Sequence, residues 1–179
     1  TLLAVGMMQG DGHSTATEDN SGQVLLFTFD DGATGKDFDD GELAAVIGAG
    51  YDNDYDGNAN PRSGKDYDIA SPVEASDMFG AAVALDYDST LNRHRLAVLA
   101  RNDQGSGNAN GADEHGAVYL FTFTDDSFSG ADHVGTIGHS YSGTSSFDYQ
   151  VTSTVVYTGG MSSVALDGNY LAIGSQFTT

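Results

Sequence analysis

Five acidic and amide side chains between residues 52 and 60 have the types and spacing that could do chemistry. Asp52, Asp54 and Asp56 alternate along the chain, and Asn58 and Asn60 follow after Gly57. Alternating carboxylates in a loop can point inward around a hard cation, and glycine at the sixth position permits the sharp turn. We therefore predict a calcium site formed by these five side chains. The alternative is a solvated acidic turn without a metal.

Other acidic clusters are weaker candidates for binding a cation. One is Asp11, between two glycines, with Glu18 and Asp19. A second group combines amides and acids: Asn102, Asp103, Asn108, Asn110 and Asp113. Asn and Asp also favour turns that hold no metal, and this reading is preferred for both groups. We interpret the remaining short acidic runs as turn acids: Asp37, Asp39, Asp40, Asp125 and Asp126.

Catalytic patterns are incomplete. The segment 138–142 begins like the glycine-serine turn of hydrolases, but its fifth residue is Ser142 and no helical pattern follows. Asp54 and Asp56 could in principle be the pair of catalytic carboxylates of a glycosidase. Paired acids in a loop have many other uses, however. His133 and His139 could share a face, but no third metal ligand is evident. We predict that the protein is not an enzyme.

The elements that must position these residues are short strands that recur along the chain. The segment Gly22–Phe29 is repeated with few changes as Gly116–Phe123. The sequence Leu3-Ala-Val returns as Leu96-Ala-Val and again as Leu171-Ala-Ile. Self-similarity of this kind is typical of proteins built from repeated structural units. The units differ in length mainly within connectors rich in Gly, Asp and Ser.

An all-β fold follows from the strands and from the composition. Each apolar run is short, rich in β-branched and aromatic residues, and bounded by turn residues. Both faces of Val118–Phe123 are largely apolar, which predicts a strand sandwiched between two layers. The chain has 24 Gly and 2 Pro, and 22 of its 26 acidic residues are Asp. Asp favours turns, whereas Glu favours helices, so this bias also indicates strands joined by turns.

Charge excludes several classes of partner. The net charge is −20 at pH 7, with only 6 Lys and Arg. Nucleic acid and anionic membranes attract proteins through Lys and Arg, so neither is expected as a partner. The chain has no Cys, which excludes disulfides and Cys-ligated zinc. No apolar run is long enough for a transmembrane helix. The acidity instead suits cations and a salty exterior, and we expect an extracellular or cell-surface location.

The strands carry a resemblance to a known family. The run Phe79–Asp86, then Leu96–Val98, then Gly116–Phe123 resembles the FG-GAP repeat of integrin-α-like β-propellers, especially in tandem repeats of very large bacterial surface proteins. The last unit has Gly160-Met161 where the middle unit has Phe79-Gly80. The resemblance implies four-stranded antiparallel units arranged as propeller-like blades. It also implies a short acidic calcium loop, which Asp52–Asn60 fits. A stacked β-solenoid or fibre is the alternative architecture.

These observations predict a partial unit over residues 1–78, a complete unit over 79–159 and the start of another over 160–179. We expect a segment of a longer protein with a structural or adhesive role, stabilised by calcium. Its expected partners are neighbouring units or copies of itself, and also glycans or surface proteins. The alternative is a carbohydrate- or protein-binding propeller module, because Tyr51, Tyr55 and Tyr67 lie near the acidic loop and could stack on sugars.

Overall fold

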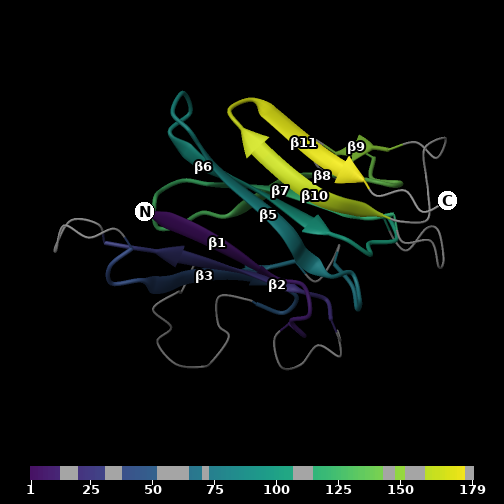
Figure 1. The fold of residues 1–179 in the computed structure, drawn as a ribbon, viewed down its shortest axis with the longest axis horizontal. Helices are drawn as coiled ribbons and strands as arrows, with labels where there is room; N and C mark the ends of the chain where they lie inside the picture. The colour runs from purple at the N-terminus through teal and green to yellow at the C-terminus, as the bar shows by residue number, and fades with distance from the viewer. Residues whose placement is uncertain are drawn as a thin grey trace.

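The computed structural model describes residues 1–12, 20–30, 38–51, 65–69, 73–106, 115–142, 148–151 and 160–175. Within these ranges the chain forms β-strands and turns and no helix, so the predicted all-β fold is confirmed (Figure 1). The described part of the chain accordingly contains no helix that could cross a membrane.

The first sheet has the order β1-β2-β3-β4. Its strands are β1 (Leu2–Met7), β2 (Gln23–Thr28), β3 (Glu42–Gly48) and the short β4 (Tyr67–Asp68). The first three strands pair antiparallel, as expected for segments joined by turns, whereas β4 runs parallel to β3.

The second sheet has the order β5-β6-β7-β8-β9. It consists of β5 (Phe79–Asp88), β6 (Arg93–Ala100), β7 (Ala117–Phe123), β8 (Asp132–Gly138) and β9 (Tyr149–Gln150). The strands pair antiparallel except for β9, which runs parallel to β8. The third sheet is the hairpin of β10 (Met161–Asp167) and β11 (Tyr170–Ser175).

The four strands of the first sheet correspond to β6, β7, β8 and β9 of the second, in detail as well as in order. In the first, the Val46 amide donates to the Asp66 carboxylate over 2.8 Å. In the second, the Thr136 amide donates to the Asp148 carboxylate over 2.9 Å. Each of these acids directly precedes the short parallel strand at the sheet edge. A buried backbone amide needs an acceptor, and both sheets supply it with an aspartate from the same place in the strand order.

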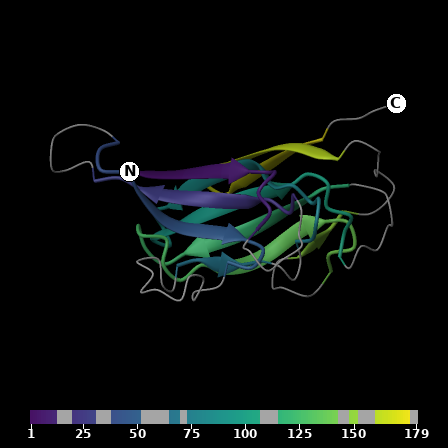
Figure 2. The same ribbon diagram turned by 90° about the horizontal axis from the view of Figure 1, so that it is seen from below.

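The sheets are stacked in layers, with the second sheet between the other two (Figures 1 and 2). One face of β7, which carries Tyr119, Phe121 and Phe123, packs in the core shared with the first sheet. The opposite face packs towards the third sheet through Val118 and Leu120. The prediction that both faces of Val118–Phe123 are covered is therefore confirmed. Its apolar residues on both sides are the physical reason that this sheet lies in the middle.

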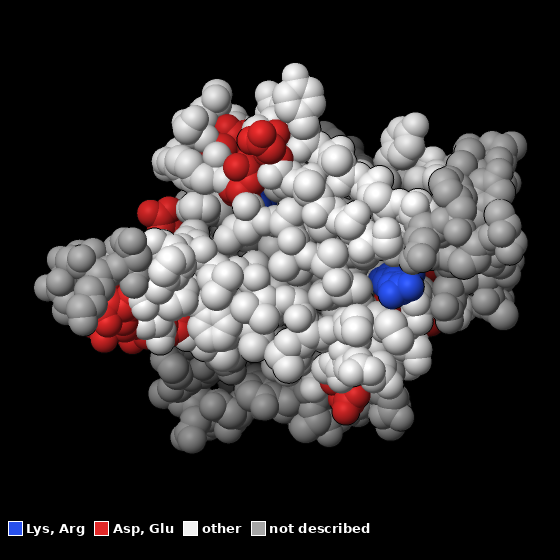
Figure 3. Space-filling model, in the orientation of Figure 1, with Lys and Arg blue, Asp and Glu red and all other residues white. Residues whose placement is uncertain are grey.

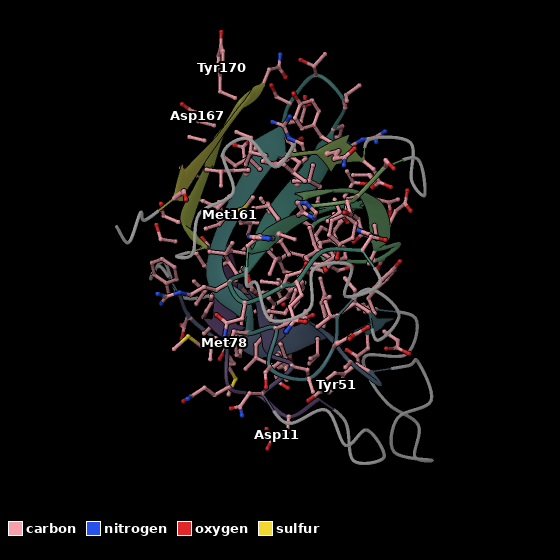
Figure 4. All side chains as sticks on the ribbon, turned by 90° about the vertical axis from the view of Figure 1, so that its right-hand side faces the viewer. Asp11, Tyr51, Met78, Met161, Asp167 and Tyr170 are labelled. Carbon is pink, nitrogen blue, oxygen red and sulfur yellow. The ribbon has the colours of Figure 1, made fainter. Side chains whose placement is uncertain are left out.

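The chain passes between sheets at two similar joints. The Phe79 amide at the start of β5 donates to the Ser21 carbonyl just before β2, over 2.8 Å. At the next joint, the Met161 amide donates to the His115 carbonyl over 3.2 Å. Met161, and not Gly160, thus stands in the place of Phe79, and it packs against the second sheet (Figure 4). The bulge that follows is one residue shorter in β10 than in β5, which a sequence alignment without gaps cannot show.

Candidate functional site

The predicted calcium ligands Asp52, Asp54, Asp56, Asn58 and Asn60 all lie outside the described residues. The calcium site therefore stays a prediction from the sequence. Among the residues that the structure does describe, no group of three or more His, Asp or Glu side chains is arranged to hold a metal ion.

The most distinctive polar cluster in the structure is centred on Asp103, in the loop after β6. This residue is buried, with only 1% of its surface exposed, although its side chain is a carboxylate. The hydroxyl of Tyr119 donates to this carboxylate, and so does the hydroxyl of Tyr141 over 2.9 Å. The Gly105 amide donates to the other carboxylate oxygen over 2.7 Å. The two hydroxyls also lie 2.8 Å from each other.

Burial dominates the electrostatics of this cluster. Removal from water raises the pKa of Asp103, although the hydrogen bonds from Tyr119, Gly105 and Tyr141 act in the opposite direction. Burial also raises the pKa of both tyrosines, and the neighbouring Asp103 carboxylate adds to the effect. The tyrosines therefore stay neutral and act as donors. Such a carboxylate, surrounded by donors, is arranged as a packing element and not as a ligand open to solvent.

The cluster corrects one reading of the sequence. The sequence grouped Asp103 with nearby amides and acids as a weak cation candidate, with a turn that holds no metal as the preferred reading. The structure places Asp103 in the core. It ties the loop after β6 to β7 and to the turn after β8, because its main-chain carbonyl also accepts from Gly116 over 2.9 Å. In the first sheet the corresponding bond runs from Gly22 to the Gly10 carbonyl over 2.7 Å. Gly10 has no side chain, so the first sheet has no counterpart of the buried carboxylate.

Two other acidic residues named from the sequence accept hydrogen bonds from loop residues, whereas Asp126 pairs with His94 and is not a simple turn acid. Asp11 accepts a hydrogen bond from the Asn20 amide over 3.0 Å. Asp125 accepts from both the amide and hydroxyl of Ser127 and from the amide of Ser129. Partial burial acts to raise the pKa of Asp125, but the hydrogen bonds from Ser129 and Ser127 outweigh it and lower the pKa to about 2.

The histidines of β8 and its turn have separate neighbours. His133 lies 3.0 Å from the Thr136 hydroxyl, and its ring lies beside Tyr119 and Phe121. Burial lowers the pKa of His133, which favours the neutral ring. His139 instead contacts the Ser140 hydroxyl at 2.9 Å. Both histidines are therefore engaged in contacts within the fold and with different neighbours.

Of the tyrosines considered for sugar stacking, Tyr67 packs edge-on against Phe121 with ring centres 5.7 Å apart. Tyr51 is half-buried and donates its hydroxyl to Gln23 over 2.6 Å. Both rings are therefore partly buried and packed in the fold, and stacking of sugars on them stays a prediction. Tyr55 lies outside the described residues.

An open groove of about 1060 Å³ lies elsewhere, at the end of the molecule that holds the N-terminus. Its walls come from the ends of β1 and β2, from β5 and β6, and from the turn after β7. His94 and Asp126 meet there, with Nε2 and Oδ1 2.7 Å apart. The ring of Tyr87, which is 46% exposed, lies against His94 with ring centres 4.9 Å apart and donates its hydroxyl to Asn92. Sequence reasoning missed this groove, because its walls come from five separate segments.

We compared the chain with protein-family models, with curated proteins and with solved structures, and none of the three comparisons gave a match. The resemblance to FG-GAP repeats accordingly stays a prediction from the sequence.

Proposed function

We propose that the chain is a non-enzymatic repeat segment of an extracellular or cell-surface protein, with a structural or adhesive role. The observation that carries the proposal is the strand-by-strand correspondence between the first two sheets, which extends to their edge aspartates and their joints. Sheets of one design stacked in a row are suited to building an extended or ring-like framework.

Calcium binding at Asp52–Asn60 is part of this proposal. Its support is the sequence pattern: three alternating carboxylates, a glycine and two amides, which supply the oxygen ligands that calcium prefers. A cation there would also offset part of the net charge of −20. Such a site would stabilise the folded chain, because a ligand that binds only the folded state adds to its free energy of unfolding.

We expect calcium to raise the thermal midpoint of unfolding relative to a chelator by at least about 5 °C. A ligand at a hundred times its Kd adds about 2.7 kcal/mol, and 1 kcal/mol shifts the midpoint of a chain of this size by about 2–4 °C. The measurement is thermal unfolding followed by circular dichroism. In a variant with Asp54→Asn and Asp56→Asn, the difference between calcium and chelator should disappear.

The control for the calcium experiment removes the same amount of charge elsewhere. Asp40 and Asp167 are exposed, and Asp167 lies at the tip of the third sheet (Figure 4). With both changed to Asn, the calcium shift should persist. If the wild-type midpoint is the same with calcium and with chelator, the calcium part of the proposal is wrong. If the control loses the shift as well, the effect is one of general charge and not of this loop.

A second candidate function is carbohydrate binding, and the groove beside Tyr87 is the observation that favours it. An exposed aromatic ring with amide and carboxylate groups around it offers both stacking and hydrogen bonds. We expect Tyr87→Ala to weaken binding of any oligosaccharide found on a glycan array by about tenfold or more, which is about 1.4 kcal/mol. Tyr170→Ala, at a ring that is 81% exposed on the third sheet, should leave binding unchanged. An array without any bound glycan would remove this candidate.

A further inference from the structure

The outer face of the first sheet is the side that points away from the second sheet (Figure 2). It carries large apolar side chains that are partly exposed to water. On β1, Leu3 is 41%, Val5 37% and Met7 41% exposed. Leu25 and Phe27 on β2 are partly exposed and stand directly opposite Val5 and Leu3 in the pairing. Contiguous apolar surface of this kind usually marks an interaction site. We call these five side chains the outer face.

The second sheet has a counterpart to the outer face, and there it is covered. The matching side chains, in the order Leu3, Val5, Leu25 and Phe27, are Leu96, Val98, Tyr119 and Phe121. All four counterparts are 0–1% exposed. They are covered by the inner face of the first sheet, which presents Val24, Leu26 and Ile47 to the same core. The fold thus already shows what this kind of face does: it receives the apolar face of another sheet.

Charge supports the same interpretation. The chain carries a net charge of −20, yet β1 and β2 contain no charged residue. The side of the molecule where β1, β5 and β10 lie in front is also mostly uncharged, with one basic patch on it and with acidic side chains gathered towards its rim (Figures 1 and 3). A surface without charge can be covered by an apolar partner without the cost of removing a charge from water.

We propose that the outer face is an interface at which a second copy of this chain packs. In a two-fold arrangement the outer face of one copy lies on the same face of the other, so the surface is complementary to itself. Two sheets can pack in this way with their strands roughly aligned, as in β-sandwiches. Apolar side chains then meet apolar side chains, and the acidic rims stay in water.

The test is the mass of the full chain in solution, measured by sedimentation at several protein and salt concentrations. We expect a dimer that tightens with salt, because the repulsion between two acidic copies is screened over about 10 Å at 0.1 M salt and about 3 Å at 1 M. Leu3→Glu should raise the dissociation constant at least about tenfold, since it places a charge in the interface. The milder Val5→Thr should raise it less and tests the same face if the first variant folds poorly.

The matched control is Leu91→Glu. Leu91 is 58% exposed in the turn between β5 and β6, away from the outer face, so this charge should leave the dissociation constant unchanged. A second readout uses the absence of cysteine from the chain. A spin label on Leu3→Cys should show dipolar broadening in the dimer, because packed sheets lie about 10 Å apart, whereas a label on Leu91→Cys should not.

A chain that sediments as a monomer at every salt and protein concentration overturns the proposal. So does a dimer that Leu3→Glu leaves intact, or one in which labels at Leu3 do not broaden. The inference rests on the proposed role as a repeat segment, but the experiments can contradict the interface without contradicting that role. A calcium-dependent midpoint in a monomeric chain would contradict this interface and leave the proposed function standing.

Discussion

We expect Gly22→Ala to destabilise the fold by about 3 kcal/mol or more. Gly22 sits at the joint between the first two sheets with φ of +91°, a conformation that L side chains rarely adopt. A Cβ added there would lie 2.0 Å from the Phe79 carbonyl oxygen. That oxygen belongs to the backbone at the start of β5, so relief of the clash requires the two sheets to move apart. The measurement is the free energy of unfolding from urea denaturation.

Alanine substitutions at two further glycines distinguish the effect of the steric clash from the effect of backbone strain. Gly168, in the turn between β10 and β11, has φ of +53° but nothing within 4 Å of an added Cβ. Gly168→Ala should therefore cost only the strain, about 1 kcal/mol. Gly116, at the second joint, has φ of +78°, and an added Cβ would lie 3.0 Å from the Met161 nitrogen. Gly116→Ala should therefore lower the free energy of unfolding by an amount between those of Gly22→Ala and Gly168→Ala. Equal losses at Gly22 and Gly168 would contradict the close approach of the sheets.

We expect Asp103→Ala to lower the free energy of unfolding by about 3 kcal/mol, because it removes the shared acceptor of three buried donors. The hydroxyls of Tyr119 and Tyr141 can still pair with each other, but the Gly105 amide and one hydroxyl proton lose their partner. Tyr119→Phe should cost less, about 1–2 kcal/mol, because Tyr141 still donates to the carboxylate. Tyr51→Phe, the counterpart of Tyr141 in the first sheet, serves as the control for removal of a less buried hydroxyl. It should cost less than Tyr119→Phe.

The same carboxylate predicts a pH dependence. Its pKa in the folded protein is raised above the ordinary value of 3.8, so the folded protein binds the proton more tightly than the unfolded chain does. The resulting contribution to stability is fully present below about pH 3.8 and is lost as the pH rises through the folded pKa. Asp103→Asn cannot titrate. The stability of the wild type relative to this variant should therefore fall as the pH rises from about 3.8, and a constant difference would contradict the buried titration.

Much of the strand framework could be predicted from the sequence. Short apolar runs bounded by Gly, Asp and Asn indicated strands and turns because alternation and turn chemistry are local properties. The two apolar faces of Val118–Phe123 indicated a covered strand for the same reason. Asp125 was correctly interpreted as a turn acid, since its partners Ser127 and Ser129 lie within four residues. Where the partners are local, the residue types are enough.

The interior role of Asp103 could not be predicted in this way. Its partner Tyr141 lies 38 residues away, and only the pairing of β6, β7 and β8 in one sheet brings the two together. The same holds for the groove beside Tyr87 and for Tyr67, which packs against Phe121 in another sheet.

The sequence by itself determined the all-β class and the acidic, cysteine-free character of the chain, because these depend on composition and on local periodicity. The parallel edge strands β4 and β9 depart from the expected antiparallel four-stranded units. Only the tertiary structure decided which face of each sheet is covered. Leu3 and Leu96 stand in the same short sequence, Leu-Ala-Val, yet one is 41% exposed and the other 1%. The difference arises because a sheet packs over Leu96 and none of the described strands packs over Leu3. Burial is a property of what lies opposite a residue, and that is set by the stacking of sheets rather than by the strand itself.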